Sequence, residues 1–177
     1  MPKAANFSGE NDAYVATAKQ ALRIAVGSDH AGFGFKGMVA EHLRGLGHEV
    51  VDFGTYSTDP VDYPLIGFKV GEAVGGGECD RGVLICGSSL GVAMAANKVK
   101  GVRAASIMEP YSAKLSRQHN DCNVICFAER LTGWEMVREC LDIWLETDAE
   151  GGRHRRRVEE INNYPLAQAA SVHEAQS

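Results

Sequence analysis

The residue with the clearest potential for chemistry is Cys86, which ends the apolar run RGVLIC and opens a small-residue loop, Gly87–Gly91. A helix is expected after this loop, and a helix N-terminus lowers the pKa of a nearby thiol from its usual value of about 8.5. Backbone amides in such a loop also bind anions. The pattern indicates a thiolate, acting as base or nucleophile, beside an anion site. The alternative is a small apolar strand residue before a turn that needs small residues to fit.

Basic side chains follow farther along the chain. His119 comes near the end of an expected helix, where its protonated form is favoured, so it is a candidate acid or base near neutral pH. A plain helix cap is the alternative for His119, and Asn120 suits a turn. Arg153 and Arg157 are four residues apart and share one helix face, on which they can grip one anion. The alternative is a solvated basic face or a nucleic-acid patch.

Two other activities fit parts of the pattern. The loop Gly87–Gly91 matches G-x-S-x-G, the nucleophile elbow of serine hydrolases, with Ser89 as nucleophile. Asp121 and His154 supply the acid and the histidine in the required order, but no HGGG-type oxyanion loop follows an early strand. A cysteine phosphatase needs an arginine six residues after its cysteine. Val92 stands there, which argues against that activity.

The elements that must position these residues alternate between short apolar runs and segments of helical spacing. Strands are expected at LRIAVGSD, HEVVDFG, RGVLICG, VRAASI and NVICFA. Helices are expected at FKGMVAEHLRGLG, PLIGFKVGEAVGGG, Leu90–Lys98, Tyr111–His119 and Gly133–Glu146, and from Gly151 onward. This rhythm predicts an α/β fold, a three-layer α-β-α sandwich around a five-stranded parallel sheet, with the flavodoxin-like (Rossmann-like) order 2-1-3-4-5. Ligands then bind at the carboxyl ends of strands one and three.

Length and composition are typical of one globular domain, expected at residues 21–164 with an extension at 1–20 and a tail at 165–177. A net charge of -5 argues against a general nucleic-acid binder. No apolar run approaches the roughly 18 residues of a membrane-spanning helix, and the first 20 residues hold no signal-peptide stretch, so a cytoplasmic location without membrane association is expected. The five cysteines include no C-x-x-C pair, so reduced thiols are expected rather than disulfides or a paired zinc site.

Several motifs occur together between about Leu22 and Val158. They are SDHAG at Ser28–Gly32, DYP at Asp62–Pro64, CG followed by AANK, EPYSAKLSRQHND at Glu109–Asp121 and GGRH at Gly151–His154. On these motifs the chain resembles type B ribose-5-phosphate isomerase, in the family that includes galactose-6-phosphate and allose-6-phosphate isomerases. The resemblance implies an aldose–ketose isomerase of a sugar phosphate, foremost ribose 5-phosphate to ribulose 5-phosphate, with no metal and no organic cofactor.

The resemblance also implies catalytic roles. Cys86 would be the base that moves a proton between C1 and C2, through an enediolate. The loop residues that would hold this enediolate are Gly87, Ser89, Leu90 and Gly91. His119 would open the sugar ring, aided by Asp29 and the hydroxyl of Ser88. One subgroup of the family replaces the cysteine by a glutamate one helical turn later, but Val92 stands at that position here.

Substrate binding and assembly are implied in the same way. The phosphate would be held by His30, Arg130, Arg153 and Arg157, and sugar oxygens would be contacted by Tyr63 and Asn120. The family pattern implies a homodimer or a tetramer in which subunits share active sites. Such sharing would bring His119, Asn120 and Arg130 to the neighbour's Cys86.

Ser89 departs from the family pattern, which usually has a glycine at this position. A side chain here is expected to demand a different backbone angle or to crowd the sugar. The same chemistry on erythrulose 4-phosphate, allose 6-phosphate or galactose 6-phosphate therefore stays open. A serine hydrolase and a non-catalytic sugar-phosphate binder are the alternatives from other classes.

Overall fold

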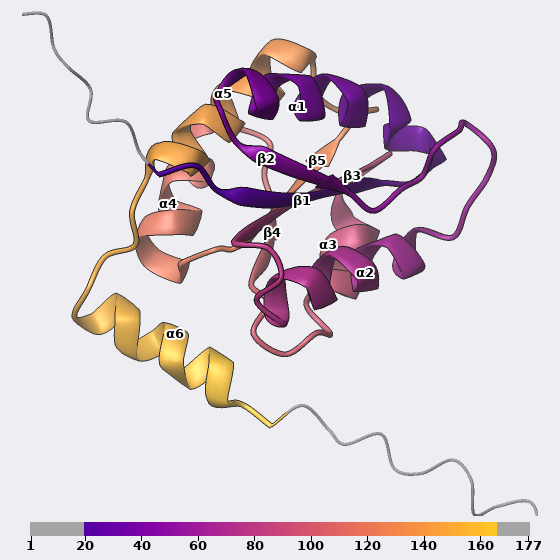
Figure 1. Cartoon of the computed structure of the whole chain (residues 1–177). Coiled ribbons are helices and arrows are strands. Elements are labelled where there is room, and N and C mark those ends of the chain that lie inside the picture. The colour runs from indigo at the N-terminus through magenta and orange to yellow at the C-terminus, as the bar shows by residue number, and fades with distance from the viewer. Residues whose placement is uncertain (1–19, 166–177) are drawn as a thin grey trace, which may run out of the picture.

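Strands and helices alternate along residues 20–165, the part of the chain that the computed structural model describes (Figure 1). The strands are β1 (Arg23–Ser28), β2 (Glu49–Asp52), β3 (Arg81–Cys86), β4 (Ala104–Ser106) and β5 (Val124–Ala128). The helices are η1 (His30–Gly32, a 3-10 turn), α1 (Phe33–Gly45), α2 (Tyr63–Gly75), α3 (Leu90–Ala96), α4 (Pro110–Asn120), α5 (Trp134–Glu146) and α6 (Arg153–Asn163). The expected extension and tail lie almost wholly outside the described residues.

The five strands form one parallel sheet, which confirms the predicted fold class. The strand order is β2-β1-β3-β5-β4, so the expected order 2-1-3-4-5 is wrong for the last two strands. Burial explains the exchange: every residue of β5 is buried, whereas the three residues of β4 are only partly buried. A strand inside a parallel sheet is covered on both faces and needs a continuous apolar run, which VICFA supplies. The short, small-residue β4 therefore lies at the edge.

Each face of the sheet has its own apolar core. The helices α1 and α5 cover one face, and α2 and α3 cover the other (Figure 1). Successive side chains of a strand point to opposite faces. In β3, Val83 and Ile85 accordingly join the α1/α5 core, while Leu84 and Cys86 join the α2/α3 core. This alternation places the Cys86 side chain under α2 and α3.

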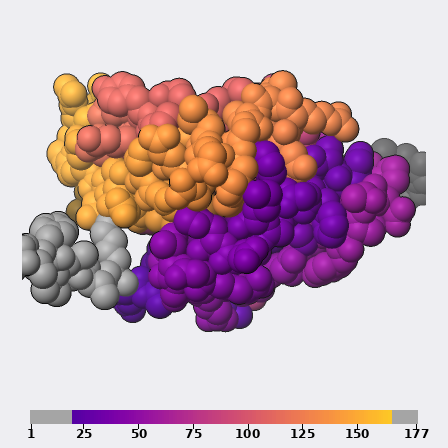
Figure 2. All heavy atoms as spheres, turned by 90° about the horizontal axis from the view of Figure 1, so that it is seen from above, coloured from indigo at the N-terminus to yellow at the C-terminus, as the bar shows by residue number. Residues whose placement is uncertain are grey.

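The last helix, α6, packs against α4 and lies at one end of the molecule. Seen from the α1/α5 side, the orange atoms of α5 lie between α1 and α4, and the yellow atoms of α6 lie beyond them (Figure 2). Only two α6 side chains, His154 and Val158, are buried. Within residues 20–165, no helix combines the length and apolar character needed to cross a membrane.

Candidate active site

The carboxyl ends of β1 and β3 lie side by side, as the sequence predicts. Ser28 pairs with Ile85 in the sheet, and the N–H of Asp29 donates to the Ile85 carbonyl over 3.3 Å. A Cβ on Gly32 would lie 2.7 Å from the Ile85 carbonyl oxygen, so the turn after β1 can approach β3 this closely only with glycine. Asp29 and Cys86 are therefore held at neighbouring strand ends.

The side chains of Asp29 and His30 are fixed by backbone hydrogen bonds. Asp29 is 7% exposed, and its Oδ1 accepts from the N–H groups of Ala31 (2.9 Å) and Gly32 (3.1 Å), capping η1. His30 Nδ1 accepts from the N–H of Val61 over 3.3 Å. A neutral His30 therefore carries its proton on Nε2, and the segment leading into α2 is tied to η1.

Cys86 ends β3, and the Gly87–Gly91 loop follows it at the carboxyl ends of the strands. Cys86 is 4% exposed and packs with apolar side chains of α2 and α3. Ser89 has φ 65° and ψ -23°, the left-handed region that favours glycine. Its buried Oγ bonds to the hydroxyl of Ser106, at the end of β4, and to the Ser88 carbonyl. The Ser89 side chain is thus directed into the protein, toward β4.

Tyr63 reaches the same loop from the start of α2. A Cβ on Gly91 would lie 2.5 Å from Tyr63 Cε2 and 2.7 Å from Cζ, so glycine leaves the space that the ring occupies. Tyr63 is 43% exposed and therefore combines contact with the loop and access to solvent. The structure brings this predicted sugar contact to the loop after β3.

Arg130 flanks the loop from the other side. Its N–H donates to the Gly87 carbonyl over 3.2 Å, and a Cβ on Gly87 would lie 3.2 to 3.3 Å from the Arg130 side chain. We expected Arg130 to reach the neighbour's Cys86, but it lies against the loop that follows its own Cys86. The cause is the pairing of β5 with β3, in which Ala128 is the partner of Cys86.

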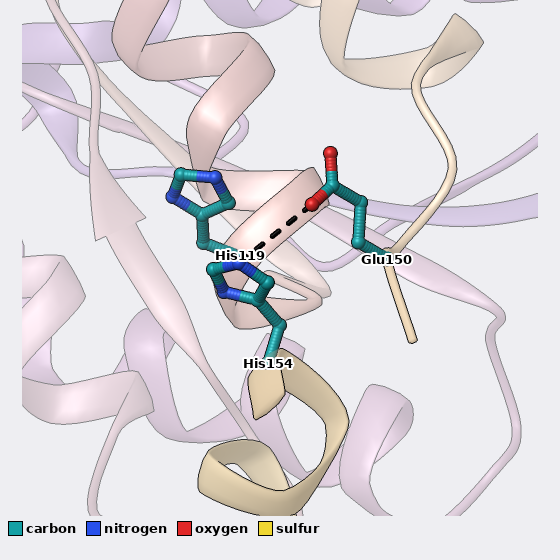
Figure 3. Close-up of side chains that lie close together, drawn as sticks. All are labelled: His119, Glu150 and His154. Carbon is teal, nitrogen blue, oxygen red and sulfur yellow. Dashed lines mark ion pairs between the residues drawn. The ribbon is translucent and has the colours of Figure 1, made fainter. Parts of the chain in front are cut away.

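A second group of predicted residues gathers where α4 ends and α6 begins (Figure 3). The rings of His119 and His154 stack with centroids 4.2 Å apart and an angle of 9° between their planes. His154 Nε2 lies 3.7 Å from a Glu150 carboxylate oxygen and accepts from Arg153 Nε over 3.3 Å. Burial, followed by the nearby His119 and Arg153, lowers the pKa of His154 below its usual value.

Within one chain, this second group lies at the amino ends of the strands, whereas Cys86 lies at their carboxyl ends. His119 and Asn120 end α4, just before β5 begins at Val124. Val124 pairs with Gly82, four residues before Cys86, which corresponds to about 13 Å of strand. The sequence-predicted residues therefore form two groups, one at the carboxyl ends of the strands and one at their amino ends.

The four arginines of α6 have different surroundings. Arg155 and Arg156 form ion pairs with glutamates one turn later on the same helix, at 3.2 Å and 2.9 Å. Arg157 lies one turn after Arg153 and lines a cavity of about 610 Å³ between α6 and the segment Asn97–Val102. Arg153 thus lies beside His154, and Arg157 lies one helical turn farther along the same face.

The comparisons with known proteins agree with one another. The Ribose/Galactose Isomerase family matches residues 24–161. Ribose-5-phosphate isomerase B of Escherichia coli (strain K12) is 50% identical over 139 residues, 78% of this chain and 93% of that protein. The structure of Clostridium thermocellum ribose-5-phosphate isomerase B has a TM-score of 0.78 and 48% identity, covering 79% of this chain and 95% of its own. This chain belongs to the ribose/galactose isomerase family.

The relatives of this chain have names that differ in their substrate. The chain is 36% identical over 147 residues to D-erythrulose-4-phosphate isomerase of Pectobacterium atrosepticum, 81% of this chain and 95% of that protein. This isomerase is therefore a sugar-phosphate isomerase of the aldose–ketose type, which confirms the class of reaction expected from the motifs.

The serine-hydrolase alternative is wrong for this isomerase. The Ser89 hydroxyl bonds to Ser106 at the end of β4, whereas the nucleophile of a serine hydrolase bonds to a histidine base. The proposed acid, Asp121, is held by Arg103 (2.9 Å) and Arg117 (2.8 Å). The isolated G-x-S-x-G pattern therefore marks a turn that requires a left-handed residue.

Sequence reasoning missed one buried group that supports the site. Lys36 Nζ donates to both carboxylate oxygens of Asp52 (2.8 and 2.7 Å) and to the Thr55 carbonyl (2.5 Å). The same loop pairs with Ser28, through Ser28 N–H to Gly54 O and Thr55 N–H to Ser28 O, each 2.7 Å. Lys36 thereby stabilises the end of β1, directly before Asp29. No local sequence motif marks Lys36, because its partner Asp52 lies in a different element, at the end of β2.

Proposed function

We propose that this isomerase interconverts ribose 5-phosphate and ribulose 5-phosphate, with Cys86 as the catalytic base. The observation that carries the proposal is the position of Cys86, at the end of β3, beside Asp29 and at the mouth of the Gly87–Gly91 loop. This is the place where parallel α/β sheets bind their ligands. The 50% identity to the Escherichia coli ribose-5-phosphate isomerase B supports ribose 5-phosphate as the substrate.

The proposed reaction moves hydrogen within one molecule. The Cys86 thiolate removes the C2 proton of the open-chain aldose, the C–H electron pair forms the C1–C2 double bond, and O1 takes the negative charge. The thiol then returns its proton to C1 while the O2 proton passes to O1, which leaves a ketone at C2. Backbone amides of the Gly87–Gly91 loop, which follows Cys86, are proposed to stabilise the oxyanion, and Asp29 and the Ser88 hydroxyl are proposed to aid His119 in ring opening. Fixed donors stabilise such charge better than mobile water.

The proposed site is completed by a second copy of the chain. Ring opening is assigned to His119, yet His119 precedes β5, whose first residue Val124 lies about 13 Å of strand away from the level of Cys86. A homodimer, or a tetramer built from such dimers, in which the carboxyl-end group of one chain faces the amino-end group of the other would unite the two groups. The exposed apolar side chains Leu90 and Met94 on α3, 54% and 66% exposed, offer surface beside the loop for a second chain to cover.

Substrate binding is divided between the same two groups. At the carboxyl ends of the strands, His30 and Arg130 are proposed to contact the phosphate and Tyr63 a sugar oxygen. At the amino ends, Arg153 and Arg157 are proposed to grip the phosphate, with Asn120 on a sugar oxygen. The charge of two arginines one turn apart suits the dianionic phosphate.

The Ser89 side chain does not occupy space that a five-carbon substrate would need. It bonds to Ser106 inside the protein, so it adds no group to the outer side of the loop. The four-carbon D-erythrulose 4-phosphate is the alternative substrate that the relatives favour. The proposed step uses no metal and no organic cofactor, and the cytoplasmic location stays a prediction.

The test is a panel of four- to six-carbon aldose and ketose phosphates, followed by NMR for exchange of the C2 proton with solvent. We expect the highest kcat/KM with ribose 5-phosphate and none detectable for Cys86→Ala. Cys79→Ala, which truncates another buried cysteine, is the matched control and should remain active. Exchange at the normal rate in Cys86→Ala would overturn the mechanism, and a preference for erythrulose 4-phosphate would overturn the substrate.

Mixing two inactive variants tests the shared site. Cys86→Ala and His119→Ala, refolded together, form mixed dimers in which one of the two sites has both groups intact. Random pairing should restore roughly a quarter of the wild-type activity. If the mixture stays as inactive as its components, each chain must complete its own site.

A further inference from the structure

Three side chains that could ligate a metal ion lie close together near the amino ends of the strands (Figure 3). Among residues 20–165, His119, Glu150 and His154 are the group whose donor atoms could hold a metal ion, with these atoms within 4.8 Å of one another. Figure 3 shows His119 approaching from α4, His154 from α6 and Glu150 from the segment between α5 and α6. Three elements thus present two imidazoles and one carboxylate to one small volume.

This donor set is one that zinc prefers. Two histidine nitrogens and one carboxylate oxygen, with a fourth position left to water or another ligand, form a common zinc site. Zinc–ligand bonds of about 2.0–2.1 Å place tetrahedral donor atoms about 3.4 Å apart, so the present spread of up to 4.8 Å must shrink by about 1.4 Å. Side-chain rotation of Glu150, whose side chain is 47% exposed, supplies part of that movement.

The surroundings also hold the ligands near one another. The N–H of Glu150 donates to the Gln118 carbonyl over 2.8 Å, which fixes the carboxylate-bearing segment beside the residue that precedes His119. A cavity of about 370 Å³, lined by His119 and Glu150 among others, gives room for an ion and its water. An ion can therefore reach the three side chains from this cavity, through His119 and Glu150.

Two features must change when an ion binds. The stacked imidazoles lie almost parallel, so their rings must tilt before the nitrogen lone pairs converge on one point. The Arg153 guanidinium donates to His154 Nε2 and must swing away, which its exposed position at the start of α6 permits. These rearrangements, and the arginine charges nearby, favour reversible binding over a permanent structural metal.

We propose that His119, Glu150 and His154 bind a zinc ion reversibly and that zinc thereby inhibits the enzyme. The inhibitory consequence rests on the proposed function, because a metal-bound His119 cannot exchange a proton with the sugar ring. Zinc binding itself depends only on the three side chains. The two statements are therefore tested separately.

Binding is measured by isothermal titration calorimetry of the full chain with ZnCl2, in a Cys86→Ser background that removes the active-site thiol as a competing ligand. Loss of an outer hydrogen-bond partner of a metal ligand costs roughly 10–100-fold in affinity, so loss of a ligand should cost at least about tenfold. We expect this loss for Glu150→Ala and for His154→Ala. Glu160→Ala, an exposed glutamate that pairs with Arg156 on the same helix, should bind zinc like the parent. Equal affinity in all variants, or no binding in the parent, would overturn the site.

Inhibition is measured with the wild-type cysteine in place. Glu150→Ala should keep the kcat of the parent without zinc and need at least about tenfold more ZnCl2 for half inhibition. Equal zinc sensitivity in Glu150→Ala and the parent would refute the inhibitory role. Failure of the parent to isomerise any sugar phosphate in zinc-free buffer would instead refute the proposed function, and the calorimetric result would stand.

Discussion

Replacing Ser89 by glycine should leave the enzyme more stable than replacing it by alanine, although glycine removes more atoms. Ser89 has φ 65°, and its buried hydroxyl bonds to Ser106. Both substitutions remove that hydroxyl. Only glycine also removes the Cβ that makes a left-handed conformation unfavourable.

The magnitudes follow from three terms. Loss of the hydrogen bond leaves the Ser106 hydroxyl without its partner and costs about 1–3 kcal/mol in both variants. Removal of the Cβ at a left-handed position returns about 1–2 kcal/mol in the glycine variant. The greater freedom of glycine in the unfolded chain takes back about 0.4–1 kcal/mol. At the midpoints of these ranges, Ser89→Gly should be more stable than Ser89→Ala by about 0.8 kcal/mol and less stable than the wild type by about 1.2 kcal/mol.

The free energy of unfolding is measured by urea denaturation, followed by circular dichroism, at one protein concentration because association shifts apparent stability. Ser106→Ala, alone and combined with Ser89→Ala, completes a double-mutant cycle in which a coupling of about 1 kcal/mol is expected. An alanine variant as stable as the glycine variant would refute the strain argument. A coupling of zero would refute the hydroxyl pair.

Three further changes probe other parts of the structure. Gly91→Ala should displace the exposed Tyr63 ring, raising KM about tenfold or more in steady-state assays while stability changes by less than about 1 kcal/mol, because the ring can move. Lys36→Met should lower the free energy of unfolding by about 3 kcal/mol, because Asp52 loses a cation whose side chain is only 5% exposed. The pKa of His154 is lowered in the folded state, so the unfolded chain binds more protons as the pH falls through about 6.5, and stability falls over that range. His154→Gln should reduce this loss of stability, as measured by urea unfolding at several pH values across the range.

Matched controls separate these effects from general damage. Gly37→Ala adds a Cβ with no atom within 4 Å and should leave KM unchanged. Lys114→Met removes an exposed lysine and should alter stability by less than about 0.5 kcal/mol. A Gly91→Ala enzyme with normal KM would remove Tyr63 from the proposed sugar site. Equal losses in the two lysine variants, or an unchanged pH response in His154→Gln, would contradict the burial arguments.

Much of the architecture could be predicted from local patterns. Apolar runs that alternate with helical segments predict parallel strands, and the small residues after Cys86 predict a tight turn into a helix. These inferences concern neighbours in sequence, for which side-chain type and spacing are sufficient. Local patterns did not predict the order of β4 and β5 in the sheet, because this order depends on which strand is apolar enough to be covered on both faces.

The sequence by itself determined the β/α rhythm, the position of Cys86 at a strand end and the motifs that identify an isomerase. The tertiary structure decided that Arg130 lies against its own Gly87, that Lys36 binds Asp52, and that His119 stacks on His154 at the amino ends of the strands, opposite Cys86. Each of these contacts joins residues from different elements. Their distances are set by strand register and helix packing across the whole domain, which no local stretch of sequence specifies.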